Sequence, residues 1–197
     1  EFRRVLFRST KELRFAVKSE FEDIDGKMPI WRIPAHRMKM GREHLVPLSV
    51  QAAAIAKRMI EETDEEFLFP GSLPQKPISE NTMIYALYRL GYHTRQTVHG
   101  FRGLASTWAN EQLVEVGKPV MWIRKYHEDW VELQLAHSES NEVRGAYNAA
   151  EYLAPRRRMM QDWADYIDAV SGKGVPPQTP RLTLVSGEFS RDGGTGG

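Results

Sequence analysis

TVHGFRGLASTWANE, residues 97–111, has the apolar spacing of an amphipathic helix, which we expect to run from about His99 to Leu113. The residues predicted to face inward recur every three or four positions: Phe101, Leu104, Ala105 and Trp108. His99 and Arg102 are three residues apart, so they project together beside this apolar face. A guanidinium is always charged and matches phosphate oxygens with paired hydrogen bonds. Arg102 is therefore a candidate phosphate clamp, although a capping histidine and a solvated arginine would give the same spacing.

Similar apolar periods on both sides of this stretch predict further helices. Ser49 is expected to cap a helix that ends near Glu62, and Ser79 a helix that runs to Leu90 and stops at Gly91. Three more helical patterns cover residues 10–24, 130–135 and 156–169. The last of them has an apolar stripe made of Met159, Met160, Trp163 and Ile167.

Strand patterns are confined to one part of the chain. IWRIPAHRMKMGREHLVPL, residues 30–48, alternates apolar and polar residues around a turn at Gly41 and predicts two or three short strands. Residues 114–128 show no single period and are expected to form an irregular connection. The predicted fold class is therefore mainly α with a small antiparallel β-sheet near the N-terminus, an α+β arrangement.

Composition limits the chemistry that the chain can perform. The 197 residues carry a net charge of +1, so contact with nucleic acid would need local clusters of Lys and Arg. Cysteine is absent, which excludes disulfides, thiolate metal sites and a cysteine nucleophile and fits a cytoplasmic protein. No apolar run is long enough to span a membrane. The sequence has no HExxH motif, aspartate cluster or Gly-rich phosphate loop, so we expect neither a metal nor another cofactor.

The two ends of the chain differ from its middle. EFRRVLFRS, residues 1–9, is basic and unpatterned and begins with Glu rather than Met, so we expect a non-native leader and a missing upstream part. Residues 10–170 are expected to form one domain. Residues 171–197, with seven glycines and three prolines, are expected to form a disordered tail.

Three more polar residues could take part in chemistry with His99 and Arg102. LAHSESNEVRGAYNAAEY, residues 135–152, contains His137 and Tyr147, and RMKMGRE contains Lys39 on a predicted strand near a turn. The pKa of a phenol is about 10, so a nucleophilic Tyr147 would need nearby cations or a base. Each residue alone also fits a structural role: a satisfied histidine, a half-buried packing tyrosine and a solvated lysine on an edge strand.

The order of these residues along the chain resembles the catalytic domain of tyrosine recombinases, especially the integrases of temperate phages and genomic islands. The resemblance covers roughly residues 10–169. Its longest motifs are IWRIPAHRMKM, REHLVPLS, TVHGFR and QLAHSESNEVRGAYN. It implies site-specific recombination, the integration or excision of a mobile element, by transesterification of double-stranded DNA at an attachment site. A homotetramer on two duplexes would be the working form.

The resemblance also implies a role for each candidate residue. Tyr147 matches the nucleophile that forms a 3′-phosphotyrosyl link, and Arg102 the second of two clamping arginines. His99 matches the acid/base neighbour of that arginine, and His137 a second histidine that hydrogen-bonds the phosphate. Lys39 matches the lysine of a β-hairpin, the general acid for the departing 5′-hydroxyl.

One position departs from the family pattern. The first clamping arginine should lie three residues before the glutamate of KEL, residues 11–13, and this position is Ser9. Arg8 is adjacent but belongs to the predicted leader. Loss of such a donor typically costs about 10²–10³ in rate. A catalytically impaired DNA-binding remnant is therefore the alternative, and a relaxing activity like that of type IB topoisomerases is a third.

Other arginines could contact the DNA backbone or only cover the surface. Those expected to supply backbone contacts are Arg32, Arg37, Arg42, Arg95 and Arg144. The run from Arg156 to Arg158 is interpreted as a feature of a helix surface, without a DNA contact.

Overall fold

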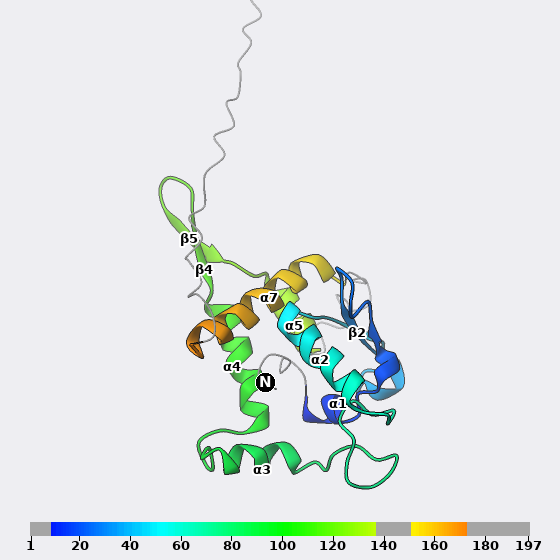
Figure 1. Ribbon diagram of the computed structural model, residues 1–197. Coiled ribbons are helices and arrows are strands. Elements are labelled where there is room, and N and C mark those ends of the chain that lie inside the picture. Colours follow the sequence, from blue (N-terminus) through cyan, green and yellow to red (C-terminus); the bar gives the residue numbers. More distant parts are fainter. Residues whose placement is uncertain (1–8, 137–150, 173–197) are drawn as a thin grey trace, which may run out of the picture.

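A computed structural model of the chain describes residues 9–136 and 151–172 (Figure 1). The tail from residue 173 and all of the predicted leader except Ser9 lie outside these ranges. The α-helices are α1 (Thr10–Arg14), α2 (Val50–Glu62), α3 (Thr82–Arg89), α4 (Val98–Glu111), α5 (Glu128–Leu135) and α7 (Leu153–Val170). The strands are β1 (Phe21–Glu22), β2 (Ile30–Ile33), β3 (His44–Pro47), β4 (Leu113–Val116) and β5 (Met121–Arg124), and short 3-10 helices are η2 (Lys18–Glu20) and η3 (Ala35–Arg37). Helices with small antiparallel sheets make this an α+β structure.

The strands β1, β2 and β3 form an antiparallel sheet in that order, with Trp31 opposite Val46. Because side chains alternate along a strand, Trp31, Ile33 and Val46 all point into the core, and each is at most 1% exposed. The Trp31 ring stacks on Phe21 with centroids 5.5 Å apart. The predicted sheet is therefore present. Helices α1 and α2 cover its inner face with Leu13 and Ala52, and together they form one of the two hydrophobic clusters of the described residues.

A second hydrophobic cluster joins α4, α5 and α7. It buries the predicted stripe of α7: Met159, Met160, Trp163 and Ile167. The prediction for α4 is wrong at Leu104, which is 50% exposed. The buried face of α4 instead follows Ala105 and Ala109, whose small side chains let the neighbouring helices approach closely. The Trp108 ring packs against the Trp163 ring, with their centroids 5.1 Å apart.

The helix predicted over residues 10–24 is much shorter, because its second half pairs with a distant segment. Val17 forms a bridge with Phe67, and the amide of Leu68 donates to the Ala16 carbonyl at 2.8 Å. These bonds take the backbone out of the helix after Arg14. By contrast, α2 begins as predicted, since the Ser49 hydroxyl accepts from the Ala52 amide.

The helix that Ser79 was expected to cap begins two residues later than predicted, at Thr82. Asn81 is the residue before the helix, and the Ser79 hydroxyl instead bonds to the hydroxyl of Thr82 at 3.0 Å. The end is as predicted: Gly91 has a φ of +83°, the left-handed conformation that favours glycine after a helix.

The connection expected to be irregular at residues 114–128 contains a β-hairpin. Strands β4 and β5 pair in antiparallel register, with Val114 opposite Ile123 and Val116 opposite Met121. Gly117, at a φ of +75°, permits the turn between them. The hairpin projects from the helices (Figure 1), and every residue of β5 is exposed. None of the helices in the described ranges combines the length and apolar character that a membrane span requires.

Candidate functional site

Helix α4 presents His99 and Arg102 as the sequence predicted. The Thr97 hydroxyl accepts a 2.9 Å hydrogen bond from the Gly100 amide and so caps the helix. His99 therefore lies in the first turn, where it is exposed, and Arg102 follows one turn later and is partly buried. Both residues belong to α4, which supports their placement on one face.

Arg102 links α4 to the end of α5. Its Nη2 donates a hydrogen bond to the main-chain carbonyl of Leu135, the last residue of α5. Burial lowers the pKa of Arg102, whereas the negative charges of Glu12 and Glu132 act in the opposite direction. An arginine keeps its charge under such conditions. The site thus contains a partly desolvated cation close to α1, α4 and α5, where its field on an anion is stronger than at an open surface.

The end of α5 leads into the part of the chain that carries the remaining motif. Ala136 caps the helix in the left-handed conformation, and its amide donates to the Leu133 carbonyl at 2.9 Å. The predicted site residues His137 and Tyr147 follow, and both lie outside the described residues. Their roles stay predictions.

Lys39 is exposed and lies in a turn between η3 and β3, not on a strand as predicted. Pro34 ends β2, because it has no amide hydrogen to continue the ladder, and residues 35–37 form a 3-10 turn. Two residues before Lys39, the Arg37 guanidinium pairs with the Glu20 carboxylate and donates to the Glu12 carbonyl. The Lys39 turn is therefore anchored to α1, the helix whose Glu12 also acts on Arg102.

Ser9, at the position expected for the first clamping arginine, is the N-cap of α1. Its hydroxyl accepts from the Glu12 amide at 3.3 Å, and its own amide donates to the Glu12 carboxylate at 2.9 Å. This reciprocal pair is a capping box. The residue at this position thus supports the helix and supplies no cation.

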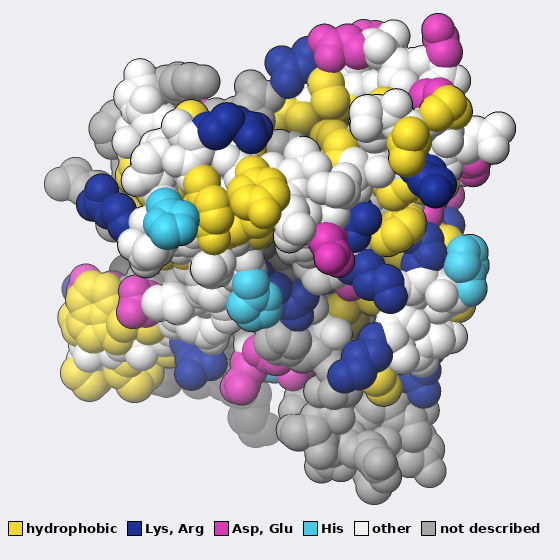
Figure 2. All heavy atoms as spheres, turned by 90° about the horizontal axis from the view of Figure 1, so that it is seen from below, with side chains coloured by type: hydrophobic (Ala, Val, Ile, Leu, Met, Phe, Trp, Pro, Cys, Tyr) yellow, Lys and Arg dark blue, Asp and Glu magenta, His cyan; other side chains and the backbone are white. Residues whose placement is uncertain are grey.

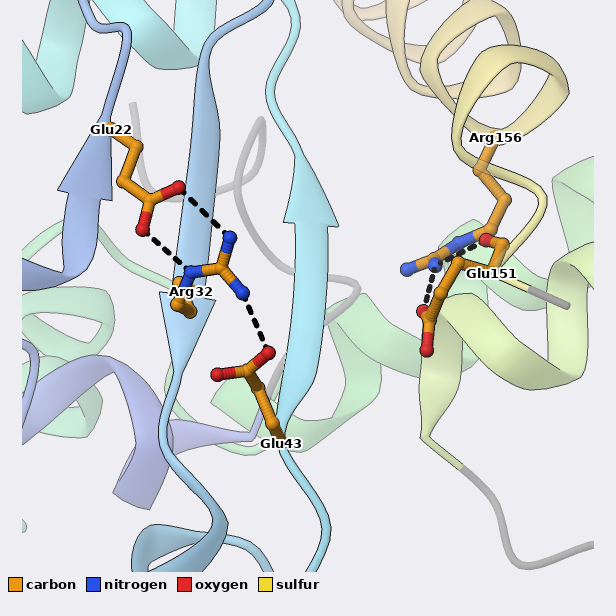
Figure 3. Close-up of polar contacts among 5 residues, drawn as sticks. All are labelled: Glu22, Arg32, Glu43, Glu151 and Arg156. Carbon is orange, nitrogen blue, oxygen red and sulfur yellow. Dashed lines mark hydrogen bonds and ion pairs between the residues drawn. The ribbon is translucent and has the colours of Figure 1, made fainter. Parts of the chain in front are cut away.

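Two of the arginines expected at the DNA backbone are engaged within the protein, and Figure 3 shows one of them, Arg32. Arg32 on β2 pairs with Glu22 at 2.5 Å and with Glu43 at 2.6 Å, and the hydrogen bond that Arg32 donates to Glu22 raises the pKa of Arg32. Arg37 is paired with the buried Glu20. Arg42 and Arg95 are exposed, and Arg144 lies outside the described residues.

The interpretation of Arg156 as a surface residue is wrong. Its side chain is fully buried and bonds to Gln134, Glu151 and Leu45. The sequence shows three consecutive arginines and gives no sign that one of them points inward. Arg158, two positions later, is exposed as expected.

One exposed surface, which we call the α3 surface, was not predicted as a unit from the sequence. It comprises the exposed side chains Tyr85, Tyr88, Arg89, Tyr92, His93 and Arg95. The Tyr88 and His93 rings meet edge to face at 4.4 Å. Residues 81–110 contain no Asp or Glu, a signal that the sequence does offer. Figure 2 views the molecule from the side on which α3 lies in Figure 1, and basic and histidine side chains lie there among hydrophobic ones, with some acidic groups.

Tyr126 is a tyrosine that the structure excludes as a nucleophile. It is 3% exposed, and its hydroxyl donates a 2.7 Å hydrogen bond to Asp162. Burial and this bond raise the pKa of Tyr126 far above the ordinary phenol value. A phenol that is kept protonated and covered cannot attack a large substrate.

Comparison with known proteins agrees with these features. The model of the phage integrase family matches residues 16–153. The chain is 40% identical over 173 residues to prophage integrase IntA of Escherichia coli K12 and 43% identical over 186 residues to the integrase of Enterobacteria phage P4. Each alignment covers 86% of this chain and 39% of the relative.

A third relative, prophage integrase IntZ of Escherichia coli K12, is 41% identical over 146 residues, which are 73% of this chain and 33% of that protein. The chain thus spans well under half the length of these relatives. No solved structure matches it significantly.

Proposed function

The chain belongs to the phage integrase family, and on this premise we propose that it performs site-specific recombination of double-stranded DNA through a 3′-phosphotyrosyl intermediate. One observation carries the proposal: the Arg102 guanidinium bonds to the Leu135 carbonyl, two residues before His137. An arginine, the cation best matched to phosphate oxygens, therefore contacts the residue two positions before His137, and the sequence continues from there to the predicted nucleophile, Tyr147.

In the proposed step, the Tyr147 oxygen attacks a backbone phosphorus and passes its proton to His99. The bond from phosphorus to the 5′-oxygen breaks, and Lys39 gives that oxygen a proton, so the products are a 3′-phosphotyrosine and a 5′-hydroxyl. Arg102 and His137 stabilise the charge on the pentavalent phosphorus. Because one phosphoester replaces another, a 5′-hydroxyl can reverse the step and rejoin the strands without ATP.

The α3 surface is an argument for DNA as the substrate. Its arginines have no acidic neighbour in sequence, and clustered cations are what attract a phosphate backbone. We place the duplex across α3 and the first turns of α4, so that His99 and Arg102 reach a phosphate. The working form is proposed to be a cytoplasmic homotetramer that pairs two attachment sites.

Covalent trapping tests the proposal. The protein is incubated with a pool of nicked duplexes whose core sequence is randomised, and SDS-stable protein–DNA adducts are recovered and sequenced. The expected result is an adduct that Tyr147→Phe abolishes and Tyr152→Phe, the matched control five residues away, retains. Adducts that survive Tyr147→Phe would refute the assignment of the nucleophile. Relaxation of supercoils without strand exchange would indicate the topoisomerase-like activity instead.

Ser9 favours a second candidate, a DNA-binding remnant with impaired cleavage. Its side chain caps α1 and provides no positive charge toward the phosphate. The substitution Ser9→Arg separates the two candidates. If only this cation is missing, Ser9→Arg raises adduct formation by about 10²–10³. If both proteins bind duplexes of the randomised pool but neither forms an adduct, the remnant is the correct description.

A further inference from the structure

The fully buried Arg156 makes an unusual set of contacts at the beginning of α7, and Figure 3 shows the one with Glu151. Its Nε donates to the side-chain oxygen of Gln134 at 3.0 Å, and its Nη2 donates to the main-chain carbonyl of Leu45 at 2.7 Å. Its Nη1 donates to the main-chain carbonyl of Glu151 at 3.0 Å and lies 3.7 Å from the Glu151 carboxylate. Each nitrogen of the guanidinium thus bonds to a different stretch of chain.

Burial of such a group is costly unless its donors are satisfied. Apolar side chains of similar volume often serve equally well for stability alone. A planar guanidinium adds something that they lack, because its rigid fork fixes the positions of several acceptors relative to one another. The contacts of Arg156 therefore indicate that it fixes the relative positions of Gln134, Glu151 and Leu45.

The three acceptors are close in sequence to the proposed catalytic residues. Gln134 precedes Leu135, the residue that Arg102 holds, and is three residues before His137. Glu151 is four residues after Tyr147. Leu45 is on β3, the strand that follows the Lys39 turn. Arg156 thus bonds to Gln134, shortly before the segment 137–150, and to Glu151, directly after it. Its bond to Leu45 links these two residues to β3.

We propose that Arg156 is a positioning residue, which holds the main chain of Glu151 against Gln134 and Leu45 and thereby fixes the described residues that precede and follow the sequence segment with Tyr147. The inference rests on the proposed function. Arg156 itself touches neither DNA nor the reacting phosphate in this scheme. Its loss should slow the covalent step and leave DNA affinity unchanged.

The test compares Arg156→Met, Arg156→Lys and the control Arg158→Met. Methionine keeps length and apolar volume without the fork, lysine keeps the charge, and Arg158 is an exposed arginine on the same helix. Affinity is measured with a duplex from the randomised pool, and the rate of adduct formation at saturating DNA is measured separately. Both Arg156 variants are expected to lose about 10²-fold in that rate, as small misplacements of reacting groups do, with unchanged affinity. Arg158→Met should match the unsubstituted protein.

Hydrogen exchange gives a second readout that does not need activity. Amides of residues 133–136 and 151–153 should exchange faster in Arg156→Lys than in the unsubstituted protein, while those of α2 stay unchanged. Equal adduct rates in all variants, or exchange that rises equally in α2, would overturn the inference, the latter by showing a general structural role. If the unsubstituted protein forms no adduct, the proposed function fails, and the exchange pattern still decides whether Arg156 holds these ends.

Discussion

The guanidinium of Arg102 on α4 donates a hydrogen bond to the main-chain carbonyl of Leu135 at the end of α5. A lysine at this position would keep the charge but could not bond to the carbonyl and grip a phosphate with the same planar fork. We therefore expect Arg102→Lys to reduce the rate of adduct formation by about 10²–10³, as loss of one donor to the transition state does. The rate is measured at saturating DNA, with Arg158→Lys as control. A rate within the range of the control would exclude Arg102 from the clamp.

Lys39 is exposed in its turn and free to reach a leaving group, so its proposed role as general acid can be isolated. Lys39→Ala should slow cleavage of an ordinary duplex by about 10²–10⁴. A duplex with sulfur in place of the bridging 5′-oxygen removes the need for a proton, because a thiolate departs unaided. Lys39→Ala and the unsubstituted protein should cleave this duplex at similar rates. An equal defect on both duplexes would assign Lys39 a role other than proton donation.

Local patterns were sufficient for much of the fold. The stripe of α7 and the Ser49 cap of α2 are set by residues within a few positions of each other, and both are as predicted. His99 and Arg102 lie on one helix, α4, for the same reason, and their roles stay predictions. Features that depend on distant partners were missed: Arg156 is buried because its acceptors, 22 and 111 residues away, are brought to it by folding.

A missing alternation accounts for another difference. Strand β5 reads MWIR, three apolar residues in a row and all of them exposed, so no period of two marks it and the hairpin was interpreted as irregular. The Lys39 turn was likewise assigned to a strand, because nothing local shows that Arg37 is drawn toward Glu20.

The pairing of Arg37 with Glu20 should matter for stability, because both side chains are largely buried. The Glu20 carboxylate also accepts a 2.9 Å hydrogen bond from the indole of Trp31, so it is held inside the core. Arg37→Met would leave this charge without its counter-ion, and we expect a loss of about 3–5 kcal/mol in the free energy of unfolding. Adding Glu20→Gln to this variant should recover most of the loss. Urea unfolding measures the stability of the single and the double variant. If the two substitutions lower the free energy of unfolding additively, Arg37 and Glu20 are not coupled.

Tyr126 should make the protein sensitive to alkali. Burial raises the pKa of its phenol in the folded state, whereas in the unfolded state it titrates near its ordinary value of about 10. Above that pH the unfolded chain loses a proton that the folded chain keeps, so the free energy of unfolding falls as the pH rises. Tyr126→Phe should flatten this fall in denaturant melts between pH 9 and about 11. An unchanged slope would show that another group is responsible.

The α3 surface makes a quantitative prediction about salt. If Arg89 and Arg95 each neutralise one phosphate, then Arg89→Ala and Arg95→Ala should each reduce the slope of log affinity against log salt concentration by about 0.9, because each releases one fewer counter-ion. Arg58→Ala on α2 is the control, since Arg58 lies near Glu62 on the same helix. The affinity of a duplex from the randomised pool is measured by titration at several salt concentrations. If Arg58→Ala reduces the salt slope as much as Arg89→Ala does, the duplex does not lie on α3.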